Sequence, residues 1–100
     1  MSAPPITVVD NPAAERFEAH VDGQVAFAAY RRFDGAIVFT HTEVPDALEG
    51  RGVGSALARG ALDLVIAAGQ DIVPLCPFIA AWIARHPDYA RHVRKGPPSG

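Results

Sequence analysis

Three glycines alternate with other residues in segment 49–55, which reads EGRGVGS, and this spacing is the clearest chemical signal in the sequence. Gly50, Gly52 and Gly54 carry no Cβ atom, so a ligand can approach the backbone closely at these positions. A predicted amphipathic helix follows at once, and its first amide groups have no partners within the helix. Because the helix dipole is also positive at this end, we predict a site for a phosphate or pyrophosphate.

Two familiar phosphate-binding loops do not fit this segment. A P-loop requires a lysine after its last glycine, whereas Gly54 is followed by Ser55 and Ala56. A dinucleotide-binding loop requires a third glycine at the position of Ser55, after the first strand of a parallel unit. The sequence therefore disfavours both ATP and NAD as ligands.

Two acid–base candidates lie just before the glycine segment. His41 and Glu43 are two residues apart on a predicted strand, so in a regular strand they share one face. Glu43 is the better candidate for a catalytic base, because it lies nearer the glycines, where a β-bulge would re-aim its side chain. The alternative for Glu43 is a solvated carboxylate at a strand end. For His41 we favour a partly buried structural role.

A single cysteine provides the third candidate. Cys76 follows a later predicted strand and stands next to a helix start at Pro77, a position that favours a reactive thiolate. We predict a catalytic role, either as a nucleophile that accepts an acyl group or as an acid that protonates a leaving thiolate. The alternative is a small buried hydrophobic residue. Tyr89 is a second candidate acid, with surface packing as its alternative.

Hydrophobic alternation and turn residues predict five strands and two helices. The strands are expected at residues 6–10, 15–21, 25–32, 36–44 and 71–75, and the helices at residues 53–68 and 77–86. Asp22-Gly23 predicts a hairpin between the second and third strands. A right-handed crossover through the first helix would make the fifth strand parallel to the fourth. The expected fold class is therefore α/β (α+β), with a mixed, mostly antiparallel five-stranded sheet.

The same periodicity predicts which side chains are buried. The residues expected to face the core from the third strand are Val25, Phe27 and Ala29. In the first helix we expect Leu64 on the inner, apolar face. On the outer face we expect Leu62 and Ile66 to be exposed, where they could cover a dimer partner or pack under the C-terminal tail. In the second helix Phe78 and Trp82 are expected in the core.

Composition limits the kinds of protein that this chain can be. One hundred residues, 49% of them hydrophobic, make one domain, which we expect at residues 1–95, with a disordered tail at 96–100. The net charge of −2 disfavours nucleic acid and anionic membranes as partners, and no apolar run is long enough to cross a bilayer. The single cysteine and the lack of a signal peptide suggest a cytoplasmic protein. No Cys/His cluster has metal-binding spacing, so we expect no metal.

The order of these elements and the glycine segment together resemble the GNAT superfamily of acyl-CoA-dependent N-acetyltransferases. The resemblance rests on HTEVPDALEGRGVGSAL and the later VPLCPF. The family loop reads Q/R-x-x-G-x-G/A between a strand and a helix, and Glu49 replaces its first residue here. The resemblance covers residues 6–89 and is closest to a small single-domain branch that lacks the usual two N-terminal helices. The acid tyrosine found in many members is absent from the second helix.

This resemblance implies acetyl-CoA as co-substrate and transfer of its acetyl group to an unidentified amine. The fourth and fifth strands would splay apart to admit the acyl arm, with Glu43 and Val44 pairing with the pantetheine amides. The residues implied in pyrophosphate binding through their backbone amides are Arg51, Gly52, Val53, Gly54 and Ser55. The alternative function is a non-catalytic CoA-binding or protein-interaction module. The chain is expected to be a monomer or a weak homodimer.

Overall fold

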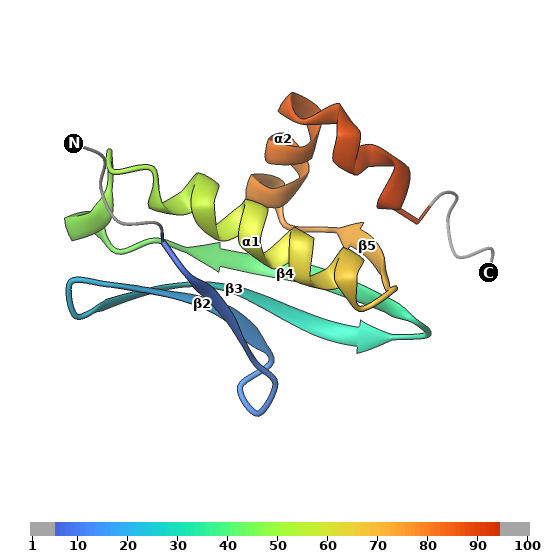
Figure 1. Cartoon of the computed structure of the whole chain (residues 1–100), viewed down its shortest axis with the longest axis horizontal. Helices are drawn as coiled ribbons and strands as arrows, with labels where there is room; N and C mark the ends of the chain where they lie inside the picture. Colours follow the sequence, from blue (N-terminus) through green and yellow to red (C-terminus); the bar gives the residue numbers. More distant parts are fainter. Residues whose placement is uncertain (1–5, 95–100) are drawn as a thin grey trace.

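A computed structural model describes residues 6–94 and shows one mixed sheet covered on one side by two helices (Figure 1). The strands are β1 (Val8–Asn11), β2 (Arg16–Val21), β3 (Gln24–Phe33), β4 (Ala36–Glu43) and β5 (Asp71–Pro74). The helices are α1 (Val53–Ala67) and α2 (Pro77–Arg85), with short 3-10 helices at Asp46–Leu48 and Pro87–His92. The predicted tail at 96–100 lies outside the described residues.

The sheet runs in the order β1-β2-β3-β4-β5, so each strand lies next to the one before it in the chain. The first four strands are antiparallel, and β5 pairs in parallel with β4. Asp22 and Gly23 both have positive φ, at 50° and 76°, in the hairpin between β2 and β3. The fold class predicted from the sequence is therefore confirmed, including the crossover through α1.

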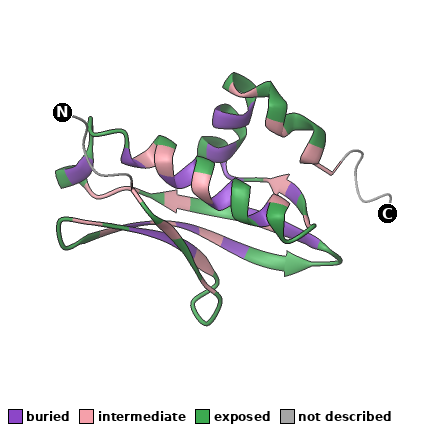
Figure 2. Cartoon of the chain, viewed as in Figure 1, coloured by how far each residue is buried: buried purple, intermediate pink, exposed green. Residues whose placement is uncertain are grey.

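A β-bulge in β4 changes the direction of the side chains that follow it. Ala29 of β3 pairs with His41 and Tyr30 pairs with Phe39, which leaves Thr40 without a partner on β3. The extra residue reverses the alternation, so Thr42 faces the same side as Phe39 while His41 and Glu43 face the other. The two helices cover the side of the sheet that carries Phe39 and Thr42, and they leave the opposite side, the uncovered face, without a covering helix (Figure 2).

The inward face predicted for β3 is wrong. The buried residues of this strand are Ala26, Ala28 and Tyr30, whereas Val25, Phe27 and Ala29 are only partly buried. Helix α1 packs against the small alanine side chains, which allow the helix to approach the sheet closely. Because the apolar residues Val25 and Phe27 lie on the uncovered face, hydrophobicity alone predicted the wrong buried side of the strand.

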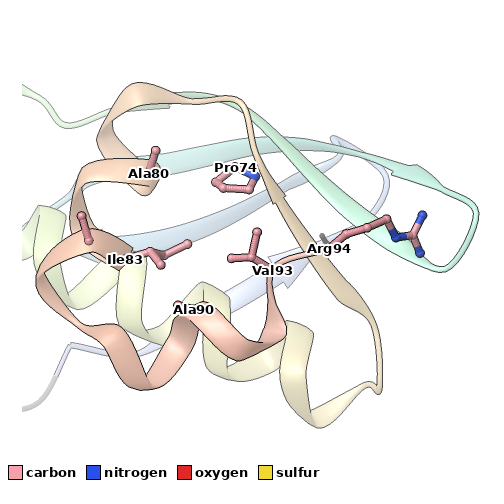
Figure 3. A pocket seen from close by; sticks show the side chains of 7 residues that line it. Pro74, Ala80, Ile83, Ala90, Val93 and Arg94 are labelled. Atoms are coloured by element: carbon pink, nitrogen blue, oxygen red, sulfur yellow. The ribbon is translucent and has the colours of Figure 1, made fainter. Parts of the chain in front are cut away.

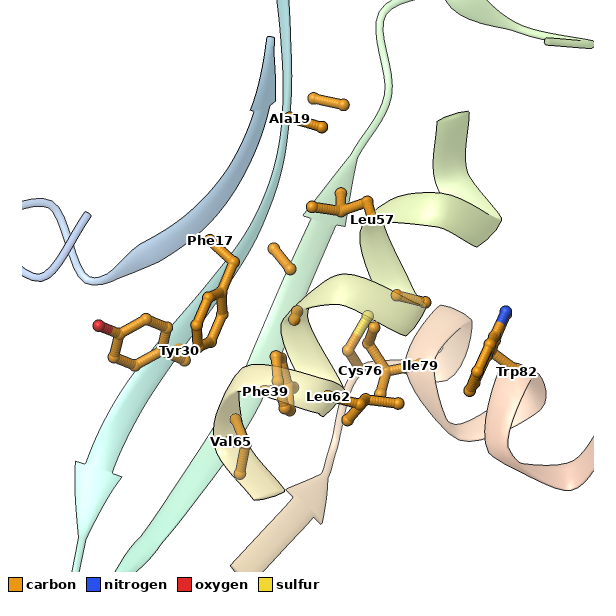
Figure 4. Close-up of a cluster of buried hydrophobic side chains, with 14 of the residues drawn as sticks. Phe17, Ala19, Tyr30, Phe39, Leu57, Leu62, Val65, Cys76, Ile79 and Trp82 are labelled. Carbon is orange, nitrogen blue, oxygen red and sulfur yellow. The ribbon is translucent and has the colours of Figure 1, made fainter. Parts of the chain in front are cut away.

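Helix α1 is buried on two sides rather than one. Leu62 is fully buried, contrary to the prediction that it is exposed, because α2 packs there; Figure 4 shows it beside Cys76 and Ile79. Ile66 is partly buried, and Leu64, which the periodicity assigns to the inner face, is 39% exposed. The apolar stripe is therefore rotated toward α2.

The core lies between the sheet and the two helices. Trp82 is fully buried as predicted, but Phe78, also predicted in the core, is 37% exposed. No helix in the part of the chain that the structure describes is long and apolar enough to span a membrane.

Candidate functional site

The glycine segment forms a tight connection between β4 and α1. The 3-10 helix Asp46–Leu48 anchors it, because Leu48 is buried in the core. Gly50 and Gly52 then have φ angles of 79° and 75°, a left-handed conformation that favours glycine. Gly52 is the N-cap of α1, so the helix starts where the sequence predicts it.

The start of α1 presents backbone amides that the helix itself does not use. The first helical hydrogen bond runs from the amide of Ala56 to the carbonyl of Gly52, at 3.0 Å. No side chain within residues 6–94 caps this helix, so the amides of Val53, Gly54 and Ser55 have no capping acceptor. The amide of Arg51 instead donates to the carbonyl of Leu48 at 3.3 Å. The amides available to an anion therefore begin after Arg51.

The side chain of Arg51 is held by the neighbouring hairpin. Its Nη1 lies 2.7 Å from Oδ2 of Asp22, at the tip of the turn between β2 and β3. Both side chains are largely exposed, and Glu49 of the same loop is also exposed. The Arg51 cation therefore stands beside the helix start, in an ion pair that an incoming anion can compete for.

Strands β4 and β5 stop pairing before β4 ends. Their last pair is Phe39 with Pro74, and the amide of Cys76 then donates to the carbonyl of Phe39 at 2.9 Å. Within residues 6–94, the rest of β4 pairs on its β3 side only. The gap begins at Cys76, whose side chain is buried and whose Sγ lies 3.2 Å from Oγ1 of Thr42. No sequence pattern selects Thr42, because its contact with Cys76 depends on the bulge.

The two predicted catalytic residues lie near the same opening but on different faces of β4. Glu43 faces the uncovered side, where its Oε2 lies 2.7 Å from Nε2 of His41. Cys76 faces the helices together with Thr42. The bulge at Thr40 is the cause of this separation. The prediction that His41 is partly buried is wrong, because its side chain is 59% exposed.

Helix α2 holds the start of α1 in place. The indole N–H of Trp82 donates to Oγ of Ser55 at 2.9 Å, and the ring of His86 stacks on the indole at 3.7 Å between centroids. Trp82 lies on the turn of α2 where many members of the GNAT superfamily, which this sequence resembles, carry an acid tyrosine. An indole N–H is not an acid at neutral pH, so Trp82 positions Ser55.

Tyr89, the second candidate acid, joins the two helices. Its hydroxyl donates to Asp63 at 2.7 Å and accepts a hydrogen bond from Arg59 at 3.3 Å. Burial, followed by the hydrogen bond to Asp63, raises the pKa of Tyr89 above its ordinary value. Both effects favour the neutral phenol, and the contacts fit the packing role.

The uncovered face of the sheet carries a carboxylate that is nearly buried. Glu18 accepts hydrogen bonds from Arg16 at 2.6 Å, His20 at 2.9 Å and Asn11 at 3.0 Å, and its side chain is 8% exposed. These bonds, led by the one from Arg16, lower the pKa of Glu18 from 4.5 to about 2. The Arg16 guanidinium in turn lies 4.6 Å above the ring of Phe27.

An apolar hollow of about 540 Å³ lies between β5, α2 and the last 3-10 helix (Figure 3). Its lining residues are Pro74, Ala80, Ile83, Ala84, Ala90, Val93 and Arg94. None of them belongs to the glycine segment, and the guanidinium of Arg94 is engaged by Asp71 at 3.0 Å. We therefore do not assign this hollow to the anion site. Within residues 6–94 no group of three or more His, Cys, Asp or Glu side chains is arranged to hold a metal ion.

The fold and the site together define a small single-sheet protein in which, within the described residues, an uncapped helix start follows β4, close to the point where the parallel strands β4 and β5 stop pairing. A solution NMR structure of a GCN5-like protein from Staphylococcus aureus has this fold, with a TM-score of 0.68, 21% identity, and coverage of 97% of this chain and 96% of that one. Protein NATD1 from Gallus gallus is 32% identical over 95 residues, which cover 90% of this chain and 86% of that protein. Protein NATD1 from Homo sapiens is 33% identical over 86 residues, with 83% and 76% covered.

The model of the family described as GCN5-related N-acetyl-transferase matches residues 16–93. This chain therefore belongs to the GCN5-related N-acetyltransferase family.

Proposed function

We propose that this protein transfers an acetyl group from acetyl-CoA to an amine. The observation that carries the proposal is that free amides at the start of α1 stand beside the gap between β4 and β5, where Cys76 lies. One end of this site suits a pyrophosphate, and the other suits a thioester. Family membership supports the same chemistry.

The residues at the site fit the cofactor. The amides of Val53, Gly54 and Ser55 would hold the pyrophosphate, with Arg51 as the nearby cation. Val44, the residue after β4, would lie along the pantetheine arm that leads to the thioester. Bound acetyl-CoA supplies an activated acetyl group.

Two groups of this chain would move protons during transfer. The carboxylate of Glu43, hydrogen-bonded to His41, would accept a proton from an amine that approaches over the uncovered face. The Cys76 thiol, with the Thr42 hydroxyl as its partner, would donate a proton to the leaving thiolate or accept the acetyl group itself. Most of the rate enhancement would come from positioning the two reactants. We place this reaction in the cytoplasm, because a single cysteine suits a reducing compartment.

Isothermal titration calorimetry with acetyl-CoA tests the cofactor. Binding should be lost in Gly54→Arg, because a Cβ there would lie 2.9 Å from Cζ of Phe78 and the side chain would cover the amides. Ala67→Arg, which adds the same charge at the exposed far end of α1, is the matched control and should bind normally. Absence of binding by the unmodified protein would refute the proposal. Mass spectrometry after incubation with acetyl-CoA would then show whether Cys76 carries an acetyl group.

The second candidate is a CoA-binding module without turnover. The observation that favours it is Trp82, a non-acidic residue, in place of the acid tyrosine. The burial of Leu62 removes part of the case for a protein-docking or dimerisation face on α1. If Glu43→Gln and Cys76→Ala bind acetyl-CoA normally, and no amine in a broad panel releases CoA from the unmodified protein, the module is the better description.

A further inference from the structure

The ring of Phe78 lies against the first turn of α1, at Gly54. An ideal Cβ built on Gly54 would meet Cζ of Phe78 at 2.9 Å and Cγ2 of Val44 at 3.6 Å. The ring therefore covers the first turn of α1 at the point where that turn meets the segment after β4. Phe78 stands two residues after Cys76, in the first turn of α2.

Exposure distinguishes Phe78 from the other large side chains of α2. Ile79, Trp82 and Ile83 are buried, whereas Phe78 is 37% exposed. A half-exposed aromatic ring at a helix end loses little packing when it rotates toward solvent, and surface side chains change rotamer within nanoseconds. The ring is therefore able to move without disturbing the core.

A ligand that reaches from the start of α1 to the Cys76 thiol has to pass this ring. Gly54 contributes one of the free amides at the start of α1, and the Cys76 thiol lies at the other end of such a ligand. The ring of Phe78 lies against Gly54. Because Gly54 has no Cβ, the ring of Phe78 can lie against the backbone of α1 at this residue. An extended acyl arm running between Gly54 and Cys76 would meet the ring of Phe78.

We propose that Phe78 is a gate that controls entry of the acyl-carrying arm and limits the size of the acyl group. This inference rests on the proposed use of acetyl-CoA. The ring rotates outward to admit the arm, so only the fraction of molecules with the ring turned outward can bind it. The apparent affinity for coenzyme A is reduced by that fraction. Shortening the side chain removes this cost and widens the channel.

Calorimetry with two probes separates the gate from the anion site. Coenzyme A carries the arm, whereas 3′-phosphoadenosine 5′-diphosphate keeps the pyrophosphate and lacks the arm. Phe78→Ala should bind coenzyme A at least about threefold more tightly than the unmodified protein, by the population argument, with unchanged affinity for the shorter probe. Phe78→Leu should fall between the two. Leu75→Ala, an equally apolar truncation at a residue that is 67% exposed, is the matched control and should change neither affinity.

The acyl series gives the second readout. The gain in affinity for Phe78→Ala should be larger with hexanoyl-CoA than with acetyl-CoA, because a longer chain needs more room. Weaker or unchanged coenzyme A binding by Phe78→Ala, or an equal change for both probes, overturns the gate and leaves the proposed function standing. Failure of the unmodified protein to bind either probe overturns both. Melting temperatures of the two Phe78 variants establish that they are folded.

Discussion

Glu18→Gln offers a direct test of the charge network on the uncovered face of the sheet. The substitution keeps the shape of the side chain but removes its charge and one acceptor oxygen, while Arg16, His20 and Asn11 remain as donors. Hydrogen bonds to a charged group contribute about 1.5–3 kcal/mol each to stability. We expect the free energy of unfolding at pH 7 to fall by about 2–3 kcal/mol.

The pH dependence gives the same prediction a second form. The pKa of Glu18 is lowered from 4.5 to about 2 on folding, so its ionised form is favoured in the folded state. The resulting stability is fully present above pH 4.5 and is lost as the pH falls toward 2. At about 1.4 kcal/mol for each unit of pKa difference, its upper limit is roughly 3 kcal/mol. The difference between the unmodified protein and Glu18→Gln should therefore shrink as the solution is acidified.

Urea unfolding followed by the fluorescence of Trp82, the only tryptophan, measures both effects between pH 3 and pH 7. Glu43→Gln is the matched control, because Glu43 lies on the same face but is 61% exposed and has His41 as its partner. This control should lose less than about 1 kcal/mol at pH 7. If Glu18→Gln is as stable as the unmodified protein at pH 7, or if both lose stability in parallel on acidification, the network does not act as described.

Three further substitutions test the contacts of α1 and its loop. Gly60→Ala places a Cβ 2.5 Å from Cγ2 of Val8, so the overpacking cost of about 1–3 kcal/mol should exceed the helix-propensity gain of about 1 kcal/mol, and urea unfolding should show a net loss. Asp22→Asn frees Arg51, so calorimetry should show tighter acetyl-CoA binding at low salt and no gain at about 1 M salt, where the charge is screened. Trp82→Phe removes the indole donor and part of a fully buried ring, so urea unfolding followed by circular dichroism should show a loss greater than about 1 kcal/mol, the contribution of the hydrogen bond alone, whereas an unchanged midpoint would argue against this bond.

The sequence alone determined the order of the elements and the start of α1 at the glycine segment. Asp22-Gly23 requires a hairpin because both residues take positive φ, and this is a local property of the chain. Gly50 and Gly52 likewise take positive φ, in the connection that precedes α1. Crossover handedness is equally general, so the parallel pairing of β4 and β5 followed from element lengths. Such features depend on backbone conformation, which neighbouring residues in the chain largely decide.

Tertiary packing decided which side chains meet. Leu62 is buried because α2 covers a second side of α1, and no periodicity within α1 indicates where a later helix will pack. Val25 and Phe27 of β3 lie outward because α1 packs over Ala26 and Ala28, where small side chains let a helix approach the sheet more closely. A single extra residue, Thr40, turns Glu43 to the face opposite Cys76. A bulge that re-aims Glu43 was expected near the end of β4, but its position at Thr40 leaves no local signal in the sequence, because the pairing of β4 with its neighbours decides it.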